Sequence, residues 1–269
     1  MRVRRSDIVS SLAKGIGACV AALGLLMLAG CAASEKATAA GSLAEIGPVQ
    51  LGACSGADLR ADGTGQSVFM EGEGGQRKLI IKRGPMPSGG EEVYQQQRLL
   101  VDGGEEKLIR EQKLLVREDG AIVLAEEINH AEGVEVVFDP PLVVLPANVE
   151  TSATVTNEGR MVVHPLGDRG RVRAKGTVRD TSTCIGSWRV STPAGEFDAW
   201  KLTSSFDADL GASRVHNETE IWVVPGIGII SERRREKTMV FGVAIRNNAE
   251  SWLLVETTAA AAGGGGEAR

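Results

Sequence analysis

The sequence has no phosphate-binding loop, no dinucleotide fingerprint and no serine nucleophile elbow. These absences argue against a nucleotide-binding protein and against a serine hydrolase. Histidine is scarce: His130, His164 and His216 stand 34 and 52 residues apart, so no pair has the spacing of a local metal site. We therefore expect no metal and no cofactor. An apolar run of about 20 residues, as a membrane-spanning helix needs, is also missing.

Basic residues do not form a stripe along the chain. The first thirty residues hold four basic side chains against one acidic side chain, so removing them takes the formal net charge from −5 to −8. An acidic domain cannot neutralise phosphates, and we expect no nucleic-acid partner. The same charge argues against docking of the folded domain on anionic lipid headgroups.

The first thirty residues have the layout of an export leader. A basic start precedes an apolar run from Ile16 to Leu28, which is too short to span a bilayer. The following Leu28-Ala29-Gly30-Cys31 resembles the bacterial lipobox. That resemblance implies cleavage before Cys31, lipidation of its sulfur and a durable acyl anchor. A plain secretory leader or an uncleaved anchor is the alternative.

The resemblance also bears on location, because Ala32 rather than aspartate follows the cysteine. It implies an outer-membrane lipoprotein facing the periplasm. The chain then divides into a signal peptide (1–30), a lipidated flexible tether (31–47), one β-rich domain (48–258) and a disordered Ala/Gly tail (259–269).

Short apolar runs separated by turn residues dominate the domain and predict an all-β fold. Asp102-Gly103-Gly104 and Asp119-Gly120 are typical of hairpin turns. We expect an antiparallel meander that forms a curved half-barrel or a β-sandwich, although 105–115 could also be helical. The proline-bracketed run from Phe138 to Pro146 should be an edge or a crossing connection. The expected strands are 67–73, 77–82, 93–101, 106–117, 121–128, 133–138, 152–156, 160–164, 171–179, 185–192, 196–206, 214–224, 227–237, 240–247 and 249–257.

Two segments of the C-terminal third carry a second resemblance. Thr192-Pro193-Ala194-Gly195-Glu196-Phe197-Asp198-Ala199-Trp200-Lys201 and Trp222-Val223-Val224-Pro225-Gly226-Ile227-Gly228-Ile229 are similar to the "TPAGxFxAxK … WxxPGxGxV" signature of an uncharacterised family of exported β-rich bacterial proteins and lipoproteins. Ser231-Glu232 stands where that family often has a lysine. The resemblance implies a lipoprotein-carrier-like half-barrel and brings no catalytic residues. Turn formation and packing explain both segments without chemistry.

Two cysteines remain in the mature domain after the leader takes Cys19 and the lipid takes Cys31. In an exported domain this favours a disulfide between Cys54 and Cys184. An alternative is that Gly52-Ala53-Cys54-Ser55-Gly56 forms a nucleophile elbow, although the next glycine leaves little room for the helix that the elbow requires.

Run 232–237 consists of six charged residues of both signs, and we expect an exposed strand or hairpin that protects a sheet edge, or a docking strip for an acidic envelope partner. Our preferred function is a non-enzymatic, membrane-anchored envelope protein that binds an apolar ligand or an envelope protein. Leu142, Leu145, Trp200 and Trp222 are the candidate ligand-lining residues. The alternatives are a structural module without ligand and a hydrolase of unknown substrate. The hydrolase needs Cys54 or one of the three histidines beside a carboxylate in a cleft.

Overall fold

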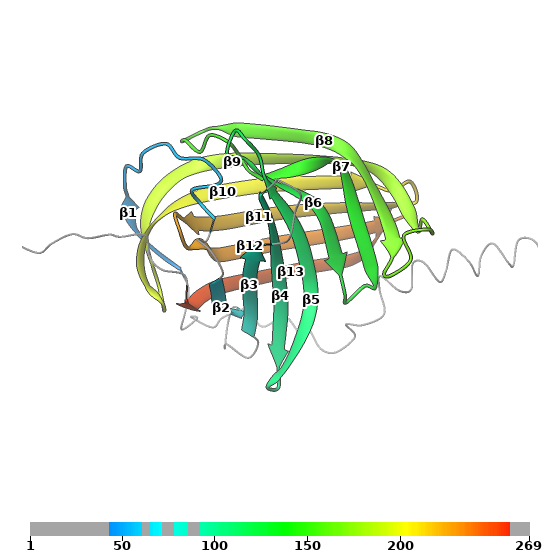
Figure 1. Cartoon of the computed structure of the whole chain (residues 1–269), viewed down its shortest axis with the longest axis horizontal. Coiled ribbons are helices and arrows are strands. Elements are labelled where there is room, and N and C mark those ends of the chain that lie inside the picture. Colours follow the sequence, from blue (N-terminus) through cyan, green and yellow to red (C-terminus); the bar gives the residue numbers. More distant parts are fainter. Residues whose placement is uncertain (1–42, 61–64, 72–77, 86–91, 259–269) are drawn as a thin grey trace, which may run out of the picture.

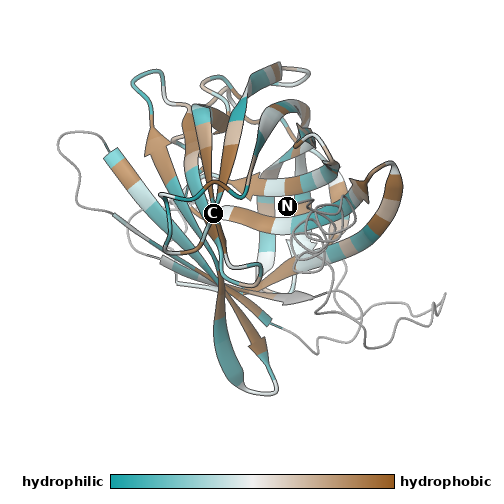
Figure 2. Ribbon diagram, turned by 90° about the vertical axis from the view of Figure 1, so that its right-hand side faces the viewer, coloured by the Kyte–Doolittle hydropathy of each residue, from teal (hydrophilic) through white to brown (hydrophobic). Residues whose placement is uncertain are grey.

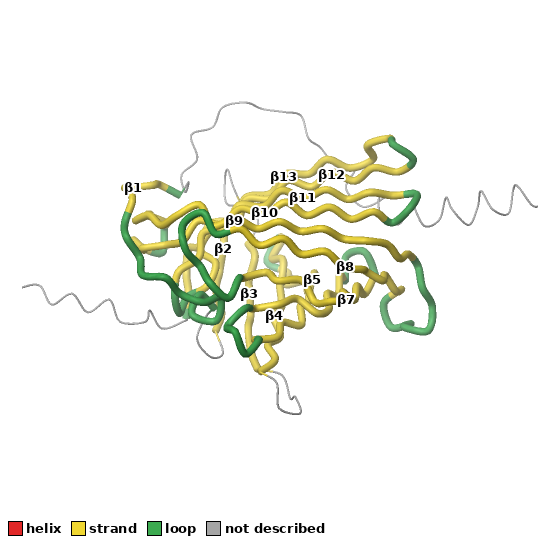
Figure 3. The backbone as a smooth tube through the Cα atoms, turned by 90° about the horizontal axis from the view of Figure 1, so that it is seen from above, coloured by secondary structure: helices red, strands yellow, loops and turns green. Residues whose placement is uncertain are grey.

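A computed structural model describes residues 43–60, 65–71, 78–85 and 92–258, and every element in them is a strand or a loop (Figure 3). No helix in these ranges is long and apolar enough to cross a membrane. The strands are β1 Ala44–Pro48, β2 Gly65–Glu71, β3 Lys78–Pro85, β4 Glu92–Asp102, β5 Glu105–Val116, β6 Ile122–Asn129, β7 Val134–Leu145, β8 Thr154–Pro165, β9 Ala174–Thr192, β10 Gly195–Asp209, β11 Ser213–Val224, β12 Gly228–Val240 and β13 Val243–Thr257.

Strands β2 to β13 form a closed antiparallel barrel in which each strand pairs with the next along the chain. The closing pair joins the two ends of the domain, with Leu254 of β13 opposite Phe69 of β2. Strand β1 is an addition: it pairs with the C-terminal part of β9, while the N-terminal part of β9 pairs with β8. The predicted all-β meander is confirmed, and the sheet curves beyond a half-barrel until its edges meet.

The barrel is flattened into two crossing layers. The long strands β9 to β13 run across the view of Figure 1, and β3 to β6 cross them steeply. Where two sheets cross at such an angle, strands that bend or bulge pass from one sheet to the other at the corners. Apolar and polar residues alternate in bands along the ribbon (Figure 2), so each strand presents one set of side chains inward and the other outward.

Tight glycine turns connect strands that are neighbours in the sequence. Gly103 and Gly104 have φ values of +59° and +89°, which only glycine adopts without strain, and they join β4 to β5 as the sequence predicts. Region 105–115 is therefore strand, not helix. Strands expected as separate pieces at 171–179 and 185–192 are continuous in β9, which is 19 residues long and strongly curved.

The proline-bracketed run lies in β7 and behaves as an edge on one side. Strand β7 pairs with β8 only as far as Asp139, directly before Pro140. The side chain of Asn157 takes over beyond that point, donating to the carbonyl of Val143 at 3.2 Å and accepting from its amide at 3.4 Å. Because proline cannot donate a ladder hydrogen bond, one side of β7 is left to a side chain.

One domain boundary differs from the expectation. The sequence predicts a flexible tether over 31–47. In the structure, strand β1 begins at Ala44 and pairs with β9, so the ordered domain begins before Gly47. The signal peptide, the lipobox with Cys31 and the tail 259–269 lie outside the described residues.

Residues 49–60 lie across one end of the barrel, where β6 begins and β7 ends. The Gly56 amide donates to the carbonyl of Pro146 at 2.7 Å, and the Ala57 amide donates to Gly120 at 2.8 Å. A Cβ atom at Gly56 would come within 2.7 Å of the Cβ atom of Leu145, so only glycine permits this approach. Leu59 is thereby fully buried beside Leu145 and becomes part of the wall of an internal cavity.

Candidate functional site

Two adjoining cavities lie between the layers of the barrel. The smaller has a volume of about 170 Å³ and the larger about 360 Å³. They share lining residues on β4, β5, β7 and β11, namely Arg98, Gln112, Val144 and Ile221. Ligand pockets commonly span about 300–1,000 Å³, so the pair together falls in the range of a small-molecule site.

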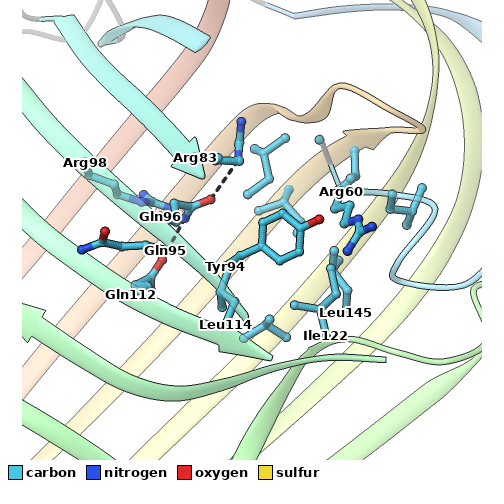
Figure 4. A pocket seen from close by; sticks show the side chains of 16 residues that line it. Arg60, Arg83, Tyr94, Gln95, Gln96, Arg98, Gln112, Leu114, Ile122 and Leu145 are labelled. Atoms are coloured by element: carbon cyan, nitrogen blue, oxygen red, sulfur yellow. Dashed lines mark hydrogen bonds between the residues drawn. The ribbon is translucent and has the colours of Figure 1, made fainter. Parts of the chain in front are cut away.

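The walls of the smaller cavity are divided by polarity. Arg83, Gln96, Arg98 and Gln112 gather on one side, whereas Leu114, Ile122 and Leu145 lie on the other, with Tyr94 between them (Figure 4). The described residues that line this cavity include three arginines and no aspartate or glutamate. Arg83 and Arg98 therefore lie on the polar side of the cavity, whereas Arg60 lies on the side of Ile122 and Leu145 (Figure 4).

Arg83 reaches the cavity from β3 without a carboxylate partner among the described residues. Its Nε donates to Oε1 of Gln96 at 3.1 Å and its Nη1 donates to Oγ of Ser67 at 3.4 Å. Burial and the repulsion of Arg98 lower the pKa of Arg83 to about 10, which leaves the guanidinium charged at neutral pH. A buried cation held only by neutral groups is costly and favours an anion beside it.

The other two arginines of this cavity are paired. Arg98 forms contacts of 2.9 and 3.1 Å with the two carboxylate oxygens of Glu232, although its buried Nε has no acceptor. Arg60 lies 2.7 Å from Oε1 of Glu92 and stacks over the Tyr94 ring at 4.6 Å.

The larger cavity holds a network of ion pairs. Among the residues described, four arginines and five carboxylates line it. The pairs are Arg98 with Glu232, Arg110 with Glu127 at 3.3 Å, Arg234 with Glu236 at 2.8 Å, and Arg246 with Glu132 at 2.8 Å and Glu236 at 3.4 Å.

Glu232 shows how the network keeps buried charges ionised. Burial would raise the pKa of this carboxyl, but the charge and hydrogen bond of Arg98, together with Arg234 and Arg110, bring it below its usual value. Glu232 therefore stays ionised at neutral pH, and its charge is balanced from more than one strand.

The fifth carboxylate of the larger cavity, Asp180 on β9, has no cation beside it. Its Oδ2 accepts from the hydroxyl of Ser182 at 3.2 Å and from Nδ2 of Asn157 at 3.5 Å. Burial raises the pKa of Asp180, and these two hydrogen bonds offset only part of that shift. In the part of the chain that the structure describes, each cavity thus contains one ionisable group without an oppositely charged partner: Arg83 in the smaller and Asp180 in the larger.

A chain of hydrogen bonds links the two cavities. Gln96 donates through Nε2 to Oε1 of Gln112 at 2.8 Å, and Gln112 donates to Oε2 of Glu127 at 2.8 Å. Arg83 begins this chain and Arg110 ends it. The amides fix the orientation of the polar wall, because each accepts from one neighbour and donates to the next.

The charged run 232–237 supplies several members of this network. The prediction that the run lies at a sheet edge is wrong. Strand β12 pairs with β11 on one side and β13 on the other. Alternate residues Glu232, Arg234 and Glu236 line the larger cavity, whereas Arg233 and Arg235 are exposed. A period of two divides the run between the interior and the solvent.

The four predicted ligand-lining residues separate into two groups. Leu145 lines the smaller cavity and Leu142 the larger. Trp200 and Trp222 are 3% and 2% exposed and pack in hydrophobic clusters instead, outside the lining of either cavity. The Trp222 ring contacts Trp188 edge to face at 5.6 Å, and Nζ of Lys201 lies 4.8 Å from the centre of the Trp222 ring.

The predicted disulfide is not formed. Cys54 and Cys184 pack in one hydrophobic cluster as free thiols. Burial raises the pKa of both thiols, that of Cys184 to about 11, so neither is a thiolate at neutral pH. Cys54 forms an isolated bridge with Val149 and is followed by a turn, not by a helix, so no nucleophile elbow is present.

The histidines lie on three separate parts of the barrel. Nε2 of His130 is 2.6 Å from Oε1 of Glu111, and Nδ1 of His164 is 2.9 Å from the carbonyl of Arg171. His216 pairs with Asp207 at 2.8 Å beside a third hollow of about 790 Å³. Within the described lining of that hollow there is no serine or cysteine.

No group of three or more His, Cys, Asp or Glu side chains in the described part of the chain is arranged to hold a metal ion.

The sequence analysis does not include the arginines and glutamines of the cavities among the candidate site residues, although the alternation of the strands carries a signal for one of them. Arg83 lies two and four residues after the buried Ile81 and Leu79, so the alternation of β3 places it on the same inward face.

No protein-family model and no curated protein matches this chain. Two solved structures are similar to it. One is a candidate lipoprotein from Parabacteroides distasonis, with 9% identity, a TM-score of 0.36, and coverage of 76% of this chain and 99% of that one. The other is a candidate exported protein with a YmcC-like fold from Bacteroides fragilis, with 11% identity, a TM-score of 0.37, and coverage of 78% and 97%.

Proposed function

We propose that this chain is a lipid-anchored protein of the bacterial envelope whose barrel binds an apolar ligand without catalysing a reaction. In this proposal Cys31 carries the anchor, and Ala32 rather than aspartate after it supports a location at the outer membrane, facing the periplasm. The observation that carries the proposal is the pair of adjoining internal cavities, one of them with an apolar wall that includes Leu114, Ile122 and Leu145.

The arrangement of the barrel supports binding over a purely structural role. A close-packed interior leaves few voids larger than a water molecule. Here the start of β6 and the end of β7, together with Leu59, surround an apolar space next to half-buried arginines. Apolar walls with a few fixed polar groups are typical of small-molecule sites.

Mass analysis of lipids that remain with the purified protein tests the binding function. We expect reproducible co-purified molecules with hydrocarbon chains. The variant Ile221→Trp should lose them, because Ile221 lines both cavities and the indole would fill the shared space. Val243→Trp is the matched control, since Val243 is 65% exposed and the same substitution there leaves the cavities unchanged. An empty wild-type protein, or equal retention in both variants, would contradict the proposal.

The anchor is tested separately with Cys31→Ser. We expect the variant to escape cleavage before residue 31, to incorporate no labelled acyl chain and to leave the fraction in which the wild-type protein sediments with outer membranes. Normal processing and sedimentation of the variant would refute the lipid anchor and leave the ligand-binding proposal intact.

A hydrolase is the second candidate, and the observation in its favour is the His216–Asp207 pair at the outer hollow. A histidine oriented by a carboxylate can act as a general base toward water. Hydrolysis of simple aryl esters that is lost in His216→Ala but kept in His164→Ala would favour this candidate over the binding protein.

A further inference from the structure

The charges of the smaller cavity are unbalanced in one direction. Of its three arginines, Arg98 is paired with Glu232 and Arg60 with Glu92, so each of these cations already has a carboxylate within 3 Å. Among the described residues, the hydrogen-bond partners of Arg83 are the neutral oxygens of Gln96 and Ser67. The cavity therefore has one positive charge to offer a ligand.

The guanidinium of Arg83 is placed where it could contact a ligand in the smaller cavity. Its guanidinium lies on the polar wall, across the cavity from Leu114, Ile122 and Leu145 (Figure 4). A guanidinium has five N–H donors in a planar fork, and the two protein acceptors around Arg83 leave most of them unused. The amide of Gln96 is held by Gln112, which keeps the fork in place.

We infer that the ligand of the smaller cavity is an amphipathic anion, with a carboxylate or phosphate head group on Arg83 and a hydrocarbon chain against the wall of Leu114, Ile122 and Leu145. This inference rests on the proposed binding function and adds the chemical class of the ligand. A bidentate contact between an arginine and a carboxylate or phosphate is about twice as strong as a neutral hydrogen bond.

The size of the smaller cavity limits the hydrocarbon part. Its volume is about 170 Å³, and an apolar cavity of about 150 Å³ is large enough to bind benzene. A longer chain would have to pass Ile221 into the larger cavity, where Arg234 and Glu236 would lose hydration or pairing. The geometry thus favours a short chain over a long one.

Calorimetric titration of the full-length protein in lipid nanodiscs tests this inference, with empty nanodiscs as the blank. The probes are octanoate, octyl phosphate, octanol as their neutral counterpart, and palmitate. We expect octanoate or octyl phosphate to bind about tenfold or more tightly than octanol, which is the range of one charge-assisted hydrogen bond. The tighter of the two anions identifies carboxylate or phosphate as the head group. Palmitate should bind more weakly than octanoate.

The variant Arg83→Gln should remove the preference for the anion and leave the affinity for octanol within about threefold of the wild-type value. Arg83→Lys should keep part of the preference, because it retains the charge but not the fork. Arg235→Gln is the matched control, since Arg235 is exposed on the outer face of β12.

Equal binding of octanoate and octanol, unchanged in Arg83→Gln, would overturn the head-group inference while the binding function stands. Failure of every probe to bind the wild-type protein would overturn the binding function itself. Tighter binding of palmitate than of octanoate would refute the limit on chain length.

Discussion

The two cavities of this barrel differ in how their charges are balanced. In the larger cavity, four arginines face five carboxylates, and the one carboxylate without a cation, Asp180, is held by neutral hydrogen bonds. In the smaller cavity, Arg83 is the unmatched group, and the lining has no carboxylate among the residues described. In the larger cavity every described charged side chain except Asp180 has an oppositely charged partner. In the smaller cavity a cation lies beside an apolar wall.

This difference separates stability from binding within one interior. Buried ion pairs contribute little net stability when compared with apolar residues, but removing one partner is costly. We therefore expect the larger cavity to hold the barrel together only while its pairs are intact. Replacing Arg83 in the smaller cavity should raise the free energy of unfolding of the protein. The same change should remove the preference of the cavity for anions.

The largest effect is expected for Glu232→Leu. This change leaves Arg98 buried without its carboxylate, and it should lower the free energy of unfolding by about 3–5 kcal/mol, measured by urea denaturation followed through tryptophan fluorescence. Replacing Arg98 by Met as well should restore most of the loss. A double variant as unstable as the single one would show that the pair itself, and not the orphaned charge, supports the fold.

Leu59→Ala should have the next largest effect. Leu59 is fully buried and lines the smaller cavity, so its truncation should cost about 2–4 kcal/mol in the free energy of unfolding. The cavity would also become larger at its apolar side, and longer alkyl carboxylates should bind relatively better than they do to the wild-type protein. Unchanged selectivity for chain length would show that Leu59 does not limit the ligand.

Arg83→Met should raise the free energy of unfolding by about 1 kcal/mol, since the variant no longer buries an unmatched cation. The pKa of Arg83 is lowered in the folded protein, to about 10, so charging it costs stability at every pH below that value and the cost falls as the pH rises above it. The gain should therefore be constant between pH 7 and 9 in urea denaturation. A loss of stability would show that the hydrogen bonds to Gln96 and Ser67 outweigh the cost of burial.

The smallest change is expected for Asp180→Asn, and it depends on pH. The pKa of Asp180 is raised in the folded protein, so the wild-type protein loses stability as the pH rises from the ordinary aspartate value through the folded one. The variant should be the more stable protein at pH 7, by less than about 1 kcal/mol, and the difference should shrink toward pH 4.

Asp198→Asn provides the control for that experiment. The hydrogen bond and charge of Arg189 lower the pKa of Asp198, so its stabilising contribution is present above the ordinary aspartate pKa and is lost as the pH falls through the folded value. Its variant should therefore be less stable at neutral pH. The same sign of pH dependence in both variants would contradict the assignment of Asp180 as an unmatched carboxylate.

Much of the fold could be predicted from local patterns. The glycine turns and the short apolar runs define the order of strands, and the observed bounds of β4, β5 and β11 differ from the expected ones by at most one residue at each end. The proline-bracketed run offers Leu142 and Leu145 as candidate lining residues beside its interpretation as an edge or crossing connection, and in the structure they line the larger and the smaller cavity respectively. For Trp200 and Trp222 the sequence favours packing and offers a ligand-lining role as the alternative, and both pack in hydrophobic clusters. Size and apolarity alone do not distinguish the two roles.

The charged interior was not predictable by the same reasoning. A strand usually reveals its inward face through apolar residues at every second position, but run 232–237 is charged at all six positions. The pattern contains no indication of which charges face inward. The position of Arg83 was accessible in principle, because it continues the face of Leu79 and Ile81.

The sequence by itself determined the antiparallel meander and its turns, because φ preferences and side-chain alternation act over a few residues. Only the tertiary structure decided that β13 meets β2, and closure of the sheet is what turns one face of every strand into an interior. Which charges are paired follows from that closure, since Arg98 and Glu232 are 134 residues apart in the sequence and meet only when the layers cross.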